Sequence, residues 1–186
     1  TSSTRRRAFL RHFYPQHTAV EMRGNLQTRL EKLKNGECDA MLLAFAGVHR
    51  MEMESYITQH LSLDQFVPAV GQGSVAIQCA VTLDAEVKEL IRKACNHPAT
   101  EATLLAERHL LAHLEGGCSV PVYGHAIHQN GQLTLQAGVL SLDGIENIVH
   151  SATGSDPALL GKEVAMELIH LGAHQLLRKI RQELGS

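Results

Sequence analysis

A cysteine on a turn is the first residue of this chain that suits covalent chemistry. Cys118 follows two glycines that end a predicted helix, and an apolar run begins two residues later at Val120. A deprotonated thiol is a good nucleophile, and nearby cations lower its pKa from a reference value of about 8.5. The position therefore suits the attachment of a covalent group. Local spacing alone favours another interpretation, a small buried hydrophobic residue behind a helix stop.

Arginine is the second chemical resource of the chain. Arg5 and Arg6 fall in the first turn of a helix predicted over residues 4–13, for which Ser2 or Ser3 is the expected N-cap. Cations at a helix N-terminus oppose the macrodipole, so the cluster predicts an anion nearby. Backbone N–H groups, a hydroxyl and guanidinium forks at one helix start form a receptor for carboxylate or phosphate.

Three further arginines lie at the boundaries of predicted elements. Arg23 precedes a helix start, Arg29 follows within that helix, and Arg50 comes shortly after an apolar strand candidate. Ligands of parallel sheets collect at the carboxyl ends of the strands, so we expect all five guanidiniums to line one cleft. The alternative for any one of them is a solvated basic surface.

Histidines give two weaker alternatives. His109 and His113, like His170 and His174, are spaced to chelate on one helix face, but neither pair has the Glu of HExxH or an evident third ligand. We therefore expect no metal site. His125 lies near Cys118 in the sequence, but no orienting acid can be named, which disfavours a protease or hydrolase.

The first half of the chain predicts alternating helices and strands. Helices are expected over residues 4–13 and 25–34, a short strand over 19–22 and a buried strand over 40–45. A segment punctuated by Pro68, Gly71 and Gly73 then leads into another apolar strand, predicted over residues 74–81. This order is typical of an α/β domain.

The second half predicts a small α+β domain. Helices are expected over residues 84–94 and 98–114, the second with a core face of leucines: Leu104, Leu105, Leu110, Leu111 and Leu114. Three strands follow, over residues 122–128, 132–140 and 146–151, with turns at Asn130-Gly131 and Asp143-Gly144. The last helix begins near residue 156, is interrupted near Gly172 and ends near Leu184. We expect helices on one face of a three-stranded antiparallel sheet.

Composition excludes several classes of protein. Hydrophobic residues make up 44% and charged residues 19% of the 186 residues, which is typical of a globular chain. No apolar run is long enough to span a membrane. The four cysteines are widely and irregularly spaced, which fits a reducing, intracellular compartment.

Charge is distributed unevenly along the chain. Residues 1–50 carry nine Lys or Arg against four Asp or Glu, while the whole chain has a net charge of −2. Because this basic part has few aromatic residues, it favours small anions over nucleic acid. The N-terminus lacks both the apolar core of a secretory signal and an initiating methionine, so we expect the chain to be cut from a longer one.

The arginines and the cysteine loop together resemble the porphobilinogen deaminase family, also called hydroxymethylbilane synthases. The matching runs are Thr1-Ser2-Ser3-x-Arg5-Arg6, Arg23-Gly24-Asn25-x-x-Thr28-Arg29-Leu30, Ala46-Gly47-x-x-Arg50, Pro68-Ala69-Val70-Gly71-Gln72-Gly73, Ala106-Glu107-Arg108 and Leu114-Glu115-Gly116-Gly117-Cys118-x-Val120-Pro121. They follow the family's order at nearly the family's spacing and extend over the whole chain.

The resemblance implies a covalent dipyrromethane cofactor, bound as a thioether to Cys118. That cofactor primes the condensation of four porphobilinogen molecules with loss of ammonia, and water then releases hydroxymethylbilane. The resemblance assigns the cofactor carboxylates to Ser3, Arg5, Arg6 and Arg29, with Asn25 as a further candidate. It assigns incoming porphobilinogen or the growing chain to Arg23 and Arg50, with Gln72 as a further candidate.

The resemblance also implies a domain plan. Residues 1–67 would be part of a second domain, an incomplete α/β domain like those of periplasmic binding proteins. Residues 68–91 would be a crossing segment with the return strand and helix of the first domain. Residues 92–186 would be the C-terminal α+β domain that carries the cofactor cysteine.

One departure from the family concerns catalysis. The family's proton-handling aspartate lies in the first domain, and no acid of this chain matches its motif, so we expect no catalytic residue here. The chain alone is then expected to be inactive, and a cytoplasmic enzyme would need the missing N-terminal domain in cis or in trans. The alternative is a non-catalytic anion-binding or scaffold module derived from the same fold.

Overall fold

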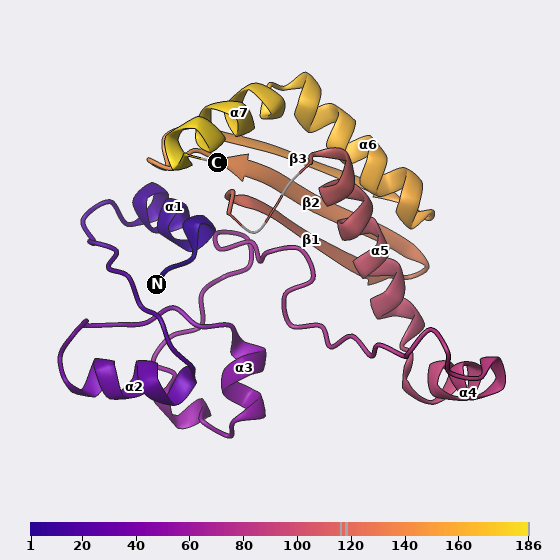
Figure 1. The fold of residues 1–186 in the computed structure, drawn as a ribbon. Helices are drawn as coiled ribbons and strands as arrows, with labels where there is room; N and C mark the ends of the chain where they lie inside the picture. The colour runs from indigo at the N-terminus through magenta and orange to yellow at the C-terminus, as the bar shows by residue number, and fades with distance from the viewer. Residues whose placement is uncertain (116, 118, 186) are drawn as a thin grey trace.

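The computed structural model of the chain describes residues 1–115, 117 and 119–185 (Figure 1). Its elements, in chain order, are α1 (Thr4–Phe13), α2 (Leu26–Lys34), α3 (Phe45–Arg50), the 3₁₀ turn η1 (Glu54–Tyr56), α4 (Ala85–Cys95), α5 (Pro98–His113), β1 (Val122–Gln129), β2 (Gln132–Leu140), β3 (Asn147–Gly154), α6 (Pro157–His170) and α7 (Ala173–Leu184). Among the described residues, no helix combines the length and apolarity needed to cross a bilayer.

The three strands form one antiparallel sheet in the order β1-β2-β3, as the sequence predicts. β1 and β2 meet at a two-residue turn in which Asn130 and Gly131 both have positive φ, 52° and 77°. This is the geometry for which Asn-Gly is favoured, because its twist matches that of the flanking strands. The register places Leu135 of β2 between Ala126 of β1 and Ala152 of β3.

Helices α5 and α6 cover one face of this sheet, and α7 continues along the same layer (Figure 1). The odd-numbered residues of β2 from Leu133 to Val139 point into this core, together with Leu110, Leu168 and Leu177 of the helices. Gly161 sets the crossing of α5 and α6, because a Cβ there would collide with the carbonyl of Ala106. The predicted small domain with helices on one face is therefore confirmed.

The predicted core face of α5 is only partly right. Leu110 and Leu114 are fully buried, but Leu105 is 40% exposed. The buried positions one turn earlier are Ala106 and Glu107. The close approach of α6 selects a small residue there, so the leucine pattern misplaced the face by one residue.

The opposite face of the sheet packs against α1. Phe9 of α1 lies 5.0 Å, between ring centroids, from Tyr123 of β1, and Phe66 joins the same cluster. The Tyr123 hydroxyl donates to the Asn147 side chain at 2.7 Å, which satisfies its only buried polar group. This contact fixes the arginine-bearing helix against the C-terminal domain.

The strands predicted in the first half are wrong. Residues 19–22, 40–44 and 74–80 have no strand structure, and Phe45 begins α3 instead of ending a strand. Strand N–H and C=O groups need a neighbouring strand, and the described residues of this half provide none. Val75 and Val81 are accordingly 87% and 94% exposed. The expected periplasmic-binding-protein-like domain is not shown.

Candidate anion-binding site

The site is built on the N-terminus of α1. Ser3 is the N-cap, and its hydroxyl accepts a hydrogen bond from the Arg6 backbone N–H at 3.4 Å. This cap begins the helix at Thr4, so that Arg5 and Arg6 fall in the first turn, as the sequence predicts. No acidic residue occupies that turn. The positive end of the helix therefore carries three further positive charges, on Arg5, Arg6 and Arg7.

Arg5 points into the protein and is only 6% exposed. One terminal nitrogen donates to the Val67 carbonyl, and the other donates to Gln72 Oε1 at 3.2 Å. Its Nε is buried and has no hydrogen-bond partner among the residues that the structure describes. A buried donor left unpaired is costly, so this guanidinium has unused binding capacity.

Arg6 shares an acceptor with Arg5. It donates to the Leu42 carbonyl at 2.9 Å and to Gln72 Oε1 at 3.3 Å. The amide oxygen of Gln72 thus joins the two guanidiniums, whereas no carboxylate among the described residues forms an ion pair with either. The pair is held by neutral acceptors only.

The electrostatics of this pair follow from its burial. Burial, and then the charge of Arg6, lowers the pKa of Arg5 from 12.5 to about 10. Burial, and then the charge of Arg29, lowers the pKa of Arg6. Arg5 stays protonated at neutral pH despite this shift. The site is therefore a concentrated positive charge in a low-dielectric surrounding, where a bound anion is strongly favoured.

A cavity of about 340 Å³ opens beside the pair. Arg5, Arg6 and Gln72 form part of its wall, and most of the remaining wall is apolar, including Leu30 and Phe66. Arg23, Arg29 and Arg50 are not among its lining residues. The structure thus brings two of the five predicted arginines together around one cavity.

Two family models match this chain, and both describe the same enzyme. One is described as "Porphobilinogen deaminase, dipyromethane cofactor binding domain" and matches residues 1–89. The other is described as "Porphobilinogen deaminase, C-terminal domain" and matches residues 101–170. The chain belongs to the porphobilinogen deaminase family. The arginine pair lies inside the first match and the sheet inside the second.

Curated relatives agree with this assignment. The porphobilinogen deaminase of Cytophaga hutchinsonii is 49% identical over all of this chain, and that of Desulfosudis oleivorans is 45% identical over 98% of it. The porphobilinogen deaminase of Geobacillus kaustophilus is 41% identical over all of the chain. This chain spans about 60% of the length of these relatives.

The described residues fit the cofactor of the porphobilinogen deaminase model. Among the described residues, neither the buried guanidinium of Arg5 nor the half-buried one of Arg6 has a carboxylate partner, and Arg5 Nε has no hydrogen-bond partner at all. A buried charge is stabilised chiefly by an opposite charge with good hydrogen-bond geometry. A ligand that carries carboxylates supplies both.

The family resemblance assigns further residues to the cofactor, and these either lie near the arginine pair or serve as the N-cap of a helix. Arg29 is close enough to Arg6 to lower its pKa, while Arg29 Nε donates to the Gly24 carbonyl at 2.8 Å. Asn25 is the N-cap of α2 and accepts from the Thr28 N–H at 2.9 Å. Cys118 lies outside the described residues.

The residues that the family resemblance assigns to the substrate lie in different surroundings. Gln72 lies at the arginine pair, as described above. Arg23 is exposed and forms an ion pair with Glu21 at 3.4 Å. Arg50 is exposed at the C-terminal end of α3. Both exposed arginines are accessible to a ligand without disrupting the core.

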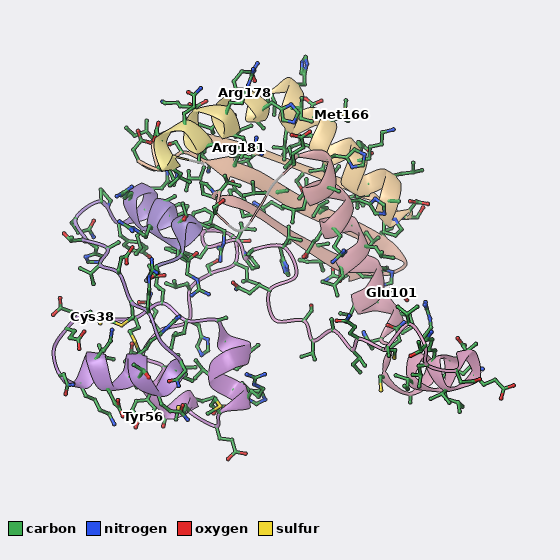
Figure 2. All side chains as sticks on the ribbon, in the orientation of Figure 1. Cys38, Tyr56, Glu101, Met166, Arg178 and Arg181 are labelled. Atoms are coloured by element: carbon green, nitrogen blue, oxygen red, sulfur yellow. The ribbon has the colours of Figure 1, made fainter. Side chains whose placement is uncertain are left out.

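The segment before Cys118 is connected to the last helix. Glu115 has a positive φ of 50°, and its carbonyl accepts a hydrogen bond from Arg181 of α7 at 2.5 Å. Figure 2 shows Arg181 on the side of α7 that faces the sheet layer. The C-terminal helix thereby holds the start of the cysteine loop.

The sequence predicts no role for Glu107, which belongs to the family-like run Ala106-Glu107-Arg108. The Glu107 carboxylate lies 3.9 Å from His125 Nδ1, so an acid does face that histidine. The available signal was a lone carboxylate within the apolar face of α5. Among the described residues, no group of three or more His, Cys, Asp or Glu is placed to hold a metal.

Proposed function

We propose that this chain is the cofactor-holding part of a transferase that condenses four porphobilinogen molecules into hydroxymethylbilane. The observation that carries the proposal is the pair of buried Arg5 and half-buried Arg6, which has no carboxylate partner among the described residues and lies in the segment matched by the cofactor-binding model. Each pyrrole of the cofactor and substrate carries an acetate and a propionate. Planar guanidiniums are suited to bind such groups through two hydrogen bonds.

The bound dipyrromethane supplies a covalent primer with a free pyrrole carbon, where condensation forms a C–C bond and releases ammonia. Arg5 and Arg6 bind its carboxylates, and Ser3 contributes the cap that sets their position. Arg29 and Asn25 complete the cofactor set at the start of α2. The thiol of Cys118 is the covalent anchor, in a loop whose first residue is held by Arg181.

Arg23, Arg50 and Gln72 bind incoming porphobilinogen and the growing chain. Exposed ion pairs contribute little stability, so the bond between Arg23 and Glu21 exchanges readily for a ligand carboxylate. Gln72 already accepts hydrogen bonds from both Arg5 and Arg6. Its position joins the cofactor set to the substrate set.

The chain alone is not expected to turn over substrate. In the complete cytoplasmic enzyme it contributes residues 1–67 as part of the second domain, 68–91 as a crossing and return segment, and 92–186 as the C-terminal domain. The catalytic aspartate comes from the first domain, supplied in cis or in trans by sequence corresponding to the rest of the relatives' length.

Intact-mass analysis tests the proposed function. The chain is co-expressed with the N-terminal part of the Cytophaga hutchinsonii relative, and an acidic aldehyde stain detects bound pyrroles. We expect a mass increase of two pyrrole units that is absent from Cys118→Ser and kept in Cys95→Ser, a matched change at an exposed cysteine. An unmodified wild-type mass would contradict the proposal and favour a non-catalytic anion-binding module.

A further inference from the structure

Glu107 is a buried carboxylate at the junction between α5 and the segment that carries Gln72. It is only 6% exposed, and burial raises the pKa of its carboxyl group. An ionisable side chain is rarely buried unless it is paired or fully hydrogen-bonded. The hydrogen-bond donors that Glu107 meets therefore determine which segments it holds together.

Both oxygens of Glu107 accept backbone hydrogen bonds from different segments. Oε2 accepts from the Gly71 N–H at 2.7 Å, and Oε1 accepts from the Ala126 N–H of β1 at 2.9 Å. A second bond, from the Gly124 N–H to the Pro68 carbonyl at 3.2 Å, also connects this segment to β1. One face of residues 68–71 is thus fixed to the C-terminal domain.

The other face of the same segment binds the arginine pair. Arg5 donates to the carbonyl of Val67, and both Arg5 and Arg6 donate to the side chain of Gln72. Gln72 directly follows Gly71, whose φ of +73° is disfavoured for other residues. A short, conformationally restricted link therefore runs from Glu107 through Gly71 and Gln72 to the guanidiniums.

We propose that Glu107 is a positioning residue for the arginine pair, acting through the Gly71-Gln72 link. The inference rests on the proposed function, in which that pair binds carboxylates. Glu107 fixes the position of Gln72. It thereby determines which guanidinium N–H groups of Arg5 and Arg6 donate to Gln72 and which remain available to donate to the ligand.

A carboxylate is specifically required at this position. It presents two acceptor oxygens and no donor, which matches the two backbone N–H groups that it meets. A glutamine of the same shape presents one oxygen and one NH₂ group, so one of the two backbone N–H groups loses its acceptor. Among the described residues, His125 is the titratable group that faces this carboxylate, with its Nδ1 3.9 Å from Oε1.

A ligand-free measurement tests the link directly. The variant Glu107→Gln is compared with Glu101→Gln, which changes a half-buried carboxylate of the same helix (Figure 2). Glu101 pairs with Arg92 at 2.9 Å. We expect NMR resonances of the Gln72 side-chain amide and of Arg5 and Arg6 Nε–H to move in Glu107→Gln and stay unchanged in Glu101→Gln. If Glu107→Gln does not fold, Glu107→Asp is measured in its place. Unmoved resonances in the folded variant would overturn the inference.

Binding of porphobilinogen, measured by calorimetry, supplies a double-mutant cycle. We expect Glu107→Gln to weaken binding about tenfold, as for the loss of one hydrogen bond to a charged group, and Gln72→Ala to weaken it at least as much, because Gln72 also belongs to the proposed substrate set. The double variant should be no weaker than Gln72→Ala alone, because Glu107 acts through Gln72. Additive losses would overturn the inference. A wild-type chain that does not bind porphobilinogen would contradict the proposed function, while the NMR comparison would still decide the role of Glu107.

Discussion

The sheet of β1, β2 and β3 and the part of the chain that precedes α5 both contain apolar segments, which take different structures. In the sheet, the core-facing side chains of β2 are almost fully buried beneath the helices that cover this face: Leu133, Leu135, Ala137 and Val139. In the part before α5, residues 74–80 form an exposed segment without strand structure that leads toward α4 (Figure 1). Apolar sequence alone therefore does not create a strand.

The difference lies in where the hydrogen-bond partners are. Each strand of the antiparallel sheet meets its neighbour after a short turn, so the hairpins carry their own partners. A strand of a parallel sheet needs a neighbour that is distant in sequence. The arginine pair sits at the boundary of the two regions, attached to the well-packed one through Phe9, Tyr123 and Glu107.

The largest expected effect separates the two regions by stability. Leu135→Ala removes a fully buried side chain and should lower the free energy of unfolding by about 3 kcal/mol. Val75→Ala removes two methyl groups from a side chain that is 87% exposed, and it should change the free energy of unfolding by less than about 0.5 kcal/mol. Urea unfolding followed by circular dichroism measures both. Equal losses would show that residues 74–80 are packed as tightly as the sheet.

A smaller effect tests the contact that joins the regions. Tyr123→Phe removes the hydroxyl that donates to Asn147 and should cost about 1 kcal/mol of unfolding free energy. Tyr56→Phe is the matched control, because that ring is half exposed. If the two variants unfold at the same urea concentration, the Tyr123 hydroxyl does not stabilise the contact between α1 and the sheet.

Local features of the fold could be predicted from the sequence. The helix caps Ser3, Asn25 and Asp84 and the Asn130-Gly131 turn are determined by residues within one or two turns of each other. The strand predicted over 40–45 failed because its formation depends on a distant partner. Leu105 was misplaced because the approach of Gly161 selects the buried face of α5, and helix periodicity does not contain that information.

The candidate site also has features that could be predicted from the sequence and features that could not. The pairing of Arg5 with Arg6 follows from their adjacency at a capped helix start. The role of Gln72 as their shared acceptor and the position of Glu107 behind it depend on contacts between residues 35 or more positions apart. The cysteine loop stays a prediction, because Cys118 lies outside the described residues.

The smallest expected effect is a pH dependence at the junction. Burial raises the pKa of Glu107 above its ordinary value of 4.5, so the folded chain keeps this proton where the unfolded chain has released it. The contribution of this group to stability is therefore present below about pH 4.5 and is lost as the pH rises through the raised pKa. Urea unfolding between pH 4 and 7 should show this decline in wild type and not in Glu107→Gln. A decline of the same size in the variant would assign it to other groups.

Cofactor loading of the arginine variants tests the central claim most directly. The chain is co-expressed with the N-terminal part of the Cytophaga hutchinsonii relative, and intact mass is measured for wild type, Arg5→Gln, Arg6→Gln and His109→Gln. The arginine pair is expected to be required for loading, so both arginine variants should carry the unmodified mass, while His109→Gln should load like wild type. Equal loading of all four proteins would contradict the assignment of the cofactor carboxylates to Arg5 and Arg6.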